Sequence, residues 1–326
     1  MTHQLAVTHH LRPSPAGRVH AVEAGSGPLV LLVHGFPESW YSWRHQIPAL
    51  AEAGYRVVAL DVRGYGRSSK PGAVEAYRLS ELVADNVALV HALGERQAVV
   101  VGHDWGSPIA SSSGLLAPET FRAVGMLSVP YNPPASGPRP TELFAGMGEA
   151  EEEFYLSYFQ QPGRAEREIE PDVRGWLAGL YSALSAETMA PPTERPPYFV
   201  PRGGTMRARF PDRRPAWLDD DALDFYADEF ERTGLTGGLN RYRAMDRDWE
   251  ELTAYAGAPL RQPALFLGGA LDTPVGWMRP AVDAFATTLP DLRVQRELPD
   301  CGHWIQQEQP AETNRLLVEW LDALQH

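Results

Sequence analysis

Short apolar runs alternate with longer amphipathic stretches in the first part of the chain. Four continuous apolar runs have the length of strands that are covered on both faces: residues 28–33, 55–61, 98–101 and 124–129. Helical spacing of apolar positions follows three of these runs, at residues 43–53, 80–93 and 107–116. Strands that alternate with helices are typical of a parallel sheet with right-handed crossovers. Before them, Leu5–His10 and Arg18–Glu23 flank a turn-rich segment and predict a hairpin.

The pattern changes after residue 131. Four segments then have helical spacing, with no clear strand between them: residues 151–160, 173–187, 220–233 and 239–252. Residues 191–215 are rich in Pro, Arg and Gly and predict a long loop. Strand patterns return at 263–269 and 292–298, with helical patterns at 280–288 and 310–324. We therefore expect an α/β core formed by residues 1–132 and 256–326, interrupted by a helical cap at 133–255.

Composition excludes several classes of protein. The chain has 326 residues and is 44% hydrophobic and 22% charged, which suffices for a large core with an insertion. A formal net charge of −13 disfavours nucleic acid and anionic membranes as partners. The single cysteine, Cys301, allows no internal disulfide, and residues 1–25 contain no apolar signal region, so we expect a cytoplasmic protein. No membrane span, no metal-ligand spacing and no dinucleotide fingerprint is found, so we expect no metal and no cofactor.

The segment Gly102-His103-Asp104-Trp105-Gly106 joins a buried strand to a helix. This order is typical of a nucleophile elbow, in which small flanking residues leave room for a strained central residue. Ser usually occupies the centre, but here it is Asp104. A carboxylate, with a reference pKa of ~3.9, is ionised at neutral pH and can attack an electrophilic sp3 carbon, which leaves an ester on the enzyme. A structural aspartate in a strand-to-helix turn is the alternative reading.

Hydrolysis of such an ester needs a base and an acid that orients it. His303 follows the last predicted strand and is the candidate base. Asp272 follows the strand at 263–269 and is the candidate acid, although it could also be a helix cap. The chain order nucleophile, acid, histidine is that of hydrolases with this elbow. Asp246 and Asp248 are the less favoured candidates for the acid.

Two further groups are needed for the chemistry. The peptide N–H groups of Phe36 and Trp105 follow strand ends and are candidates to stabilise an oxyanion. Opening of an epoxide ring produces an alkoxide. The alkoxide oxygen needs a hydrogen-bond and proton donor, and tyrosine hydroxyls are suitable donors. Spacing alone does not choose among the tyrosines of the insertion, which are otherwise core aromatics: Tyr155, Tyr158, Tyr181, Tyr226 and Tyr242.

Several motifs together resemble the α/β-hydrolase-fold epoxide hydrolases, of the capped, soluble kind found in mammals and actinobacteria. These motifs are the segment 34–44, beginning His34-Gly35-Phe36-Pro37, the elbow at 102–106, and Cys301-Gly302-His303-Trp304. The resemblance implies that Tyr155 and Tyr242 bind the epoxide oxygen, that Asp272 is the acid and that Pro37 is cis. Ser107, where a Gly often follows the elbow, and the loop 191–215 depart from the family pattern.

The first hypothesis for function is an epoxide hydrolase. Its small-molecule epoxide would become a vicinal diol through a hydroxyalkyl ester on Asp104, and the protein would be a monomer or homodimer. The alternative is a haloalkane or haloacid dehalogenase of the same fold. That enzyme needs a halide cradle, commonly Asn or Arg, where this chain has Phe36 and Trp105. A non-catalytic ligand-binding protein of the same fold is the third hypothesis.

Overall fold

A computed structural model describes residues 6–135, 137–191 and 193–325. The chain forms two compact units. The core unit comprises Met1–Lys70, Leu79–Asn132 and Pro259–His326, and the insertion unit comprises Pro71–Arg78 and Pro133–Ala258. The domain division expected from the sequence stays a prediction. The sequence did not suggest that Pro71–Arg78 belongs to the insertion unit, where Arg241 donates a hydrogen bond to the carbonyl of Tyr77.

The core unit is built on one eight-stranded sheet with the strand order β1-β2-β4-β3-β5-β6-β9-β10. Its strands are β1 (Thr8–Ser14), β2 (Gly17–Ala24), β3 (Leu29–Val33), β4 (Arg56–Leu60), β5 (Ala98–His103), β6 (Phe121–Leu127), β9 (Ala264–Gly269) and β10 (Leu292–Leu298). All neighbouring strands from β4 to β10 are parallel, while β1 and β2 form the antiparallel hairpin. The predicted hairpin is confirmed for the described residues; Leu5 lies outside them.

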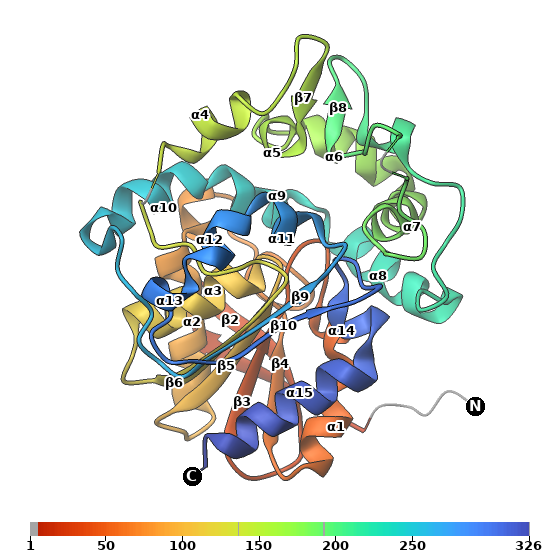
Figure 1. The fold of residues 1–326 in the computed structure, drawn as a ribbon. Helices are drawn as coiled ribbons and strands as arrows, with labels where there is room; N and C mark the ends of the chain where they lie inside the picture. The colour runs from red at the N-terminus through yellow and green to blue at the C-terminus, as the bar shows by residue number, and fades with distance from the viewer. Residues whose placement is uncertain (1–5, 136, 192, 326) are drawn as a thin grey trace. The chain divides into compact units, whose positions relative to one another are not determined.

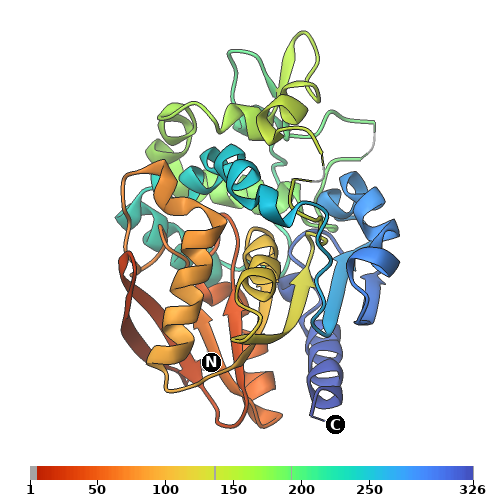
Figure 2. The ribbon, with the colours of Figure 1, turned by 90° about the vertical axis from the view of Figure 1, so that its left-hand side faces the viewer.

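Helices cover both faces of this sheet. Figures 1 and 2 show α2 (Leu79–Ala92) and α3 (Gly106–Leu116) on one face, and α1 (Gln46–Glu52) and α15 (Pro310–Ala323) on the other. Every residue of β3, β5 and β9 is buried, which explains why these strands are continuous apolar runs in the sequence. The predicted α/β class, a mostly parallel sheet with helices on both faces, is confirmed.

The insertion unit is helical but also contains a small antiparallel ribbon, β7 (Glu152–Phe154) with β8 (Phe199–Pro201) (Figure 1). The predicted helix at 151–160 is therefore wrong for its first half, and only α5 (Tyr155–Tyr158) is helical. The pairing partner of β7 lies in the predicted loop 191–215, so the helical spacing of the local sequence is overridden by a distant contact. The other helices are α4 (Pro140–Ala145), α6 (Arg164–Ile169), α7 (Val173–Ala183), α8 (Asp220–Thr233), α9 (Thr236–Arg243) and α10 (Met245–Glu251).

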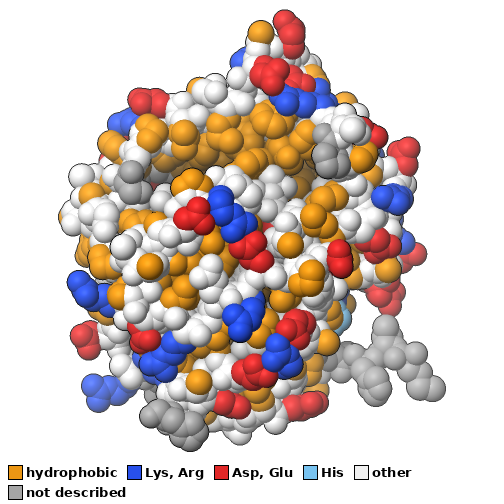
Figure 3. All heavy atoms as spheres, in the orientation of Figure 1, with side chains coloured by type: hydrophobic (Ala, Val, Ile, Leu, Met, Phe, Trp, Pro, Cys, Tyr) orange, Lys and Arg blue, Asp and Glu red, His pale blue; other side chains and the backbone are white. Residues whose placement is uncertain are grey.

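Other helix boundaries also differ from the prediction. The helix expected at 239–252 is divided at Ala244 into α9 and α10. The helical pattern near 280–288 is divided into α12 (Arg279–Asp283) and α13 (Phe285–Thr288), after a short α11 (Thr273–Trp277). Within the described part of the chain, no helix has both the length and the apolar character that crossing a membrane requires. On the face shown in Figure 3, acidic and basic side chains are interspersed.

Candidate active site

Asp104 lies at the turn between β5 and α3 in a left-handed backbone conformation, with a φ of 51°. A Cβ on Gly102 would lie 1.8 Å from the carbonyl oxygen of Gly106, and a Cβ on Gly106 would lie 1.9 Å from that of Val33. The two glycines therefore let the elbow close on itself and on β3. The glycine that makes room for Asp104 itself is Gly35, whose added Cβ would lie 2.4 Å from the Cβ of Asp104. The flanking glycines, predicted to make room for the central residue, instead make room for the backbone of the elbow and of β3.

The structure brings His303 between two carboxylates. Its Nε2 lies 3.5 Å from Oδ2 of Asp104, and its Nδ1 lies 3.0 Å from Oδ1 of Asp272. Burial alone would lower the pKa of His303, but the charges of Asp272 and Asp104 outweigh burial and raise that pKa well above its ordinary value. The side chain of Asp104 is 15% exposed, whereas that of Asp272 is fully buried. Asp104 is therefore the carboxylate of this group that a ligand can reach.

Asp272 occupies the N-cap position of α11, but its side chain makes no capping hydrogen bond. The carboxylate contacts His303 instead, so the helix-cap reading of Asp272 is wrong. The less favoured acids are engaged within the insertion unit. Asp246 accepts hydrogen bonds from the N–H and hydroxyl of Thr141, and Asp248 pairs with Arg241.

The backbone of Phe36 and the backbone of Trp105 both lie next to Asp104. The N–H of Phe36 donates a 2.8 Å hydrogen bond to Oδ1 of Asp104, and the Phe36–Pro37 peptide is cis, as the resemblance implies. Trp105 directly follows Asp104 and lies at the N-cap position of α3. Oδ1 therefore faces the N–H of Phe36, while Oδ2 faces His303.

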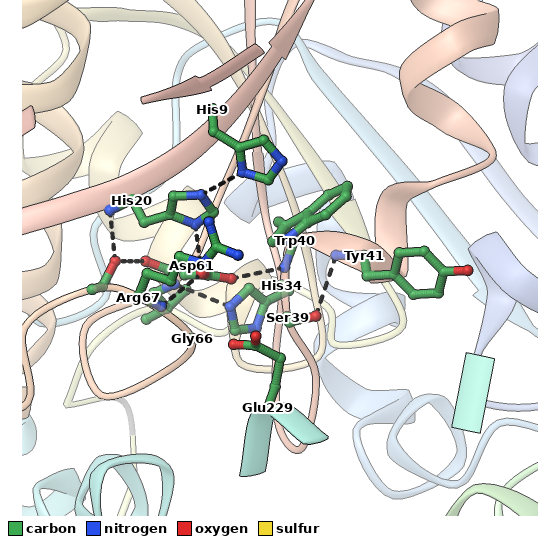
Figure 4. Close-up of polar contacts among 12 residues, drawn as sticks. His9, His20, His34, Ser39, Trp40, Tyr41, Asp61, Gly66, Arg67 and Glu229 are labelled. Atoms are coloured by element: carbon green, nitrogen blue, oxygen red, sulfur yellow. Dashed lines mark hydrogen bonds and ion pairs between the residues drawn. The ribbon is translucent and has the colours of Figure 1, made fainter. Parts of the chain in front are cut away.

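A buried network around Asp61 fixes the loop that carries Phe36 (Figure 4). The Oδ1 of Asp61 accepts from the N–H of Trp40 at 3.2 Å, and its Oδ2 lies 2.7 Å from Nδ1 of His20. His34 accepts from the N–H of Val62 at Nε2, so its Nδ1 carries the proton and donates to the carbonyl of Gly35. Burial lowers the pKa of His34, which keeps this ring neutral. Both ends of the loop are thus anchored.

The insertion unit separates the five candidate tyrosines into two kinds. The rings of Tyr155 and Tyr242 lie with their centroids 6.2 Å apart, and Phe159 packs against both, at 5.6 and 5.0 Å. The others have structural contacts: Tyr158 donates to Glu168, and Tyr181 packs on Tyr226 with centroids 5.2 Å apart. The two tyrosines that the resemblance selects are therefore neighbours.

Two residues that contact His303 and the loop around it were not predicted from the sequence. Ser128, directly after β6, places its Oγ 3.0 Å from Nδ1 of His303. Glu308 accepts hydrogen bonds from the N–H groups of Gly302 and Trp304, on either side of His303. Nothing in the sequence around Ser128 marks it, whereas Glu308 lies close enough to His303 in the chain to have been considered. Cys301 is buried, which raises the pKa of its thiol.

Comparison with known proteins identifies the family of this chain. The family model described as alpha/beta hydrolase fold matches residues 28–310. Epoxide hydrolase B of Mycobacterium tuberculosis is 41% identical, over 98% of this chain and 99% of that protein. Among solved structures, an epoxide hydrolase from an endophytic Streptomyces is 61% identical, with a TM-score of 0.96, and the match covers 99% of this chain and 97% of that one.

A second solved structure, epoxide hydrolase A from Mycobacterium thermoresistibile, is 42% identical with a TM-score of 0.90, over 97% of this chain and 98% of that one. These relatives give no support to the dehalogenase alternative. The elbow with an aspartate, the histidine between two carboxylates and these full-length matches agree with one another. This chain belongs to the epoxide hydrolases of the alpha/beta hydrolase fold.

Proposed function

We propose that this chain converts a small-molecule epoxide to a vicinal diol through a covalent hydroxyalkyl ester on Asp104. In the first step, Oδ2 of Asp104 attacks a ring carbon and the carbon–oxygen bond of the ring breaks. Tyr155 and Tyr242 donate hydrogen bonds to the ring oxygen, and one phenol gives its proton to the alkoxide. The observation that carries the proposal is that the two oxygens of Asp104 face different partners, the Phe36 N–H and His303.

In the second step, His303 takes a proton from water at Nε2, and the resulting hydroxide attacks the ester carbonyl. Oδ1 becomes the oxyanion, and the N–H groups of Phe36 and Trp105 stabilise it. The bond between the carboxyl carbon of Asp104 and Oδ2 then breaks. The diol leaves as an alkoxide through Oδ2 and takes the proton from His303. The proton lost when the Asp104 acid re-ionises restores the phenol. The 2.8 Å contact from Phe36 to Oδ1 supports this assignment of oxygens.

Electrostatics supports the order of these steps. The charge of Asp104 helps to raise the pKa of His303 in the free enzyme. Esterification removes that charge, so the pKa of His303 falls after the first step and the ring becomes a better proton acceptor. Asp272, which keeps its contact with Nδ1, holds the proton on that nitrogen and leaves Nε2 free to act as the base.

Trapping the ester tests the proposal. His303→Gln removes the base while leaving Asp104 able to attack, so incubation with styrene oxide should add the mass of the epoxide to the peptide that contains Asp104. Asp104→Asn, which removes the nucleophile, is the matched control and should remain unmodified. Diol formation by Asp104→Asn at the wild-type rate, with no added mass on His303→Gln, would rule out the covalent route.

A further inference from the structure

Ser128 has an unusual backbone for its residue type. It is fully buried directly after β6 and has a φ of 72°, in the left-handed region that only a few per cent of non-glycine residues occupy. Its N–H donates a 2.9 Å hydrogen bond to the carbonyl of Leu267 in β9, the strand that leads to Asp272. Strained residues of this kind cluster at functional sites, where the surrounding structure maintains them. The contact between the Ser128 side chain and His303 explains why Ser128 is held in this backbone conformation.

The hydroxyl of Ser128 and the carboxylate of Asp272 meet the same nitrogen. Both Oγ of Ser128 and Oδ1 of Asp272 lie 3.0 Å from Nδ1 of His303. Nδ1 carries one proton, so the two oxygens share it in a three-centre hydrogen bond. The second oxygen of Asp272, Oδ2, is buried without a hydrogen-bond partner among the described residues, so Asp272 contacts the ring through one oxygen only. Ser128 supplies the second acceptor that fixes the plane of the ring.

We propose that Ser128 is a positioning residue for His303, and that its hydroxyl sets the rate of ester hydrolysis without affecting formation of the ester. The inference rests on the proposed function, because it assigns the effect to the step in which His303 acts as a base. Attack by Asp104 needs no base, since a carboxylate is a nucleophile that does not first lose a proton to a neighbouring group. Hydrolysis needs Nε2 held in line with the water, so a ring restrained by one acceptor instead of two performs this step more slowly.

The environment of His303 defines the readout. The charged and titratable groups around the ring are Asp104 at Nε2, Asp272 at Nδ1 and His103, whose ring centroid lies 5.0 Å away. None of them changes when Ser128 is replaced. A change in the pH dependence of hydrolysis alone therefore reports on the contact between Oγ and Nδ1, whereas a general loss of structure would slow both steps.

Two substitutions separate the hydroxyl from the backbone. Ser128→Ala removes Oγ and keeps a strained side chain, while Ser128→Gly removes Oγ and also relieves the positive φ. Ser113→Ala is the matched control, because Ser113 is a buried serine of α3 whose hydroxyl bonds to the carbonyl of Ile109. Stopped-flow fluorescence with styrene oxide follows ester formation and ester hydrolysis separately, across pH 5 to 9, and thermal unfolding checks that each variant is folded.

We expect both Ser128 variants to form the ester within about twofold of the wild-type rate and to hydrolyse it about 5- to 20-fold more slowly, with a shifted pH profile. Equal hydrolysis rates in wild type and both variants would overturn the inference. A defect in Ser128→Ala that Ser128→Gly restores would also overturn it, since the backbone alone would then explain the effect. Absence of any ester in His303→Gln would instead overturn the proposed function.

Discussion

Nδ1 of His103 lies 2.8 Å from Oε2 of Glu38, and both side chains are completely buried. The other ring nitrogen of His103 lies 2.8 Å from the carbonyl oxygen of His303. A carbonyl oxygen and a carboxylate oxygen are both hydrogen-bond acceptors, so each ring nitrogen of His103 lies against an acceptor. Glu38 also accepts from the N–H of Gly35 and the amide of Gln306. This pair connects the loop that carries Phe36, the elbow and the loop that carries His303.

Glu38 makes stability depend on pH. Burial would raise its pKa, but His103 and the Gly35 N–H outweigh burial and lower it from 4.5 to about 2. The ionised carboxylate therefore stabilises the fold fully above pH 4.5, and this stabilisation is lost as the pH falls from 4.5 towards 2. We expect Glu38→Gln to lower the free energy of unfolding by about 3 kcal/mol at pH 7, with a weaker decline below pH 4.5. Urea unfolding at several pH values measures this, with Glu52→Gln, at an exposed position of α1, as control.

Asp272 is expected to act on hydrolysis of the ester. Asp272→Asn removes the charge that helps raise the pKa of His303, and the amide can present a donor to Nδ1. The proton then moves to Nε2, where it blocks the base. We expect turnover to fall by about 10³- to 10⁴-fold with the ester accumulating. Asp246→Asn, which changes the alternative acid, should stay within about twofold of wild type. Equal losses in the two variants would argue against Asp272 as the acid.

Tyr155 and Tyr242 are expected to act on the other step. Tyr155→Phe and Tyr242→Phe each remove one donor to the ring oxygen, so each should slow ester formation by about 10- to 100-fold. Ester hydrolysis should change little. Tyr226→Phe, a buried tyrosine that packs on Tyr181, is the control. Single-turnover kinetics resolves the two steps, and ester formation at the wild-type rate in the Tyr155 and Tyr242 variants would exclude them as donors.

Arginines of the loop 191–215 hold the strand that precedes Tyr155. Arg195 donates to Glu149 and Glu152 at 2.7 and 2.5 Å, and Arg209 pairs with Glu152 as well. The same loop supplies the carbonyl of Tyr198, which accepts from the N–H of Tyr155 at 2.8 Å. The loop therefore fixes the backbone from which the Tyr155 phenol extends.

Breaking this contact should weaken the proposed action of Tyr155. We expect Arg209→Gln to lower kcat/KM by about two- to tenfold, because a partly exposed ion pair contributes modestly and a small misplacement of a catalytic group is costly. Arg213→Gln changes an exposed arginine of the same loop and should leave kcat/KM unchanged. Initial rates at 50 and 500 mM NaCl extend the test, since screening should reproduce part of the defect in wild type. Identical values for Arg209→Gln and Arg213→Gln would refute a role for the ion pair.

Local features of the fold and the site could be predicted from the sequence, whereas contacts between residues far apart in the chain could not. Strands β3 and β9 were predicted almost to the residue because buried apolar runs are a local property. Asp104 and His303 were found because a local motif surrounds each of them. The β7–β8 ribbon joins Glu152 to Pro201, and Ser128 meets His303 across 175 positions, so neither contact leaves a local pattern. Gly35 was recognised as part of a motif, but its role beside Asp104 depends on the packing of two loops.

The covalent route requires that an oxygen of Asp104, and not a water molecule, forms the first bond to the epoxide. One turnover in H₂¹⁸O, with enzyme in excess over styrene oxide, tests this most directly by mass spectrometry of the diol and of the peptide containing Asp104. The covalent route predicts an unlabelled diol and ¹⁸O in the carboxylate of Asp104. A labelled diol in that first turnover, with an unlabelled Asp104, would contradict it.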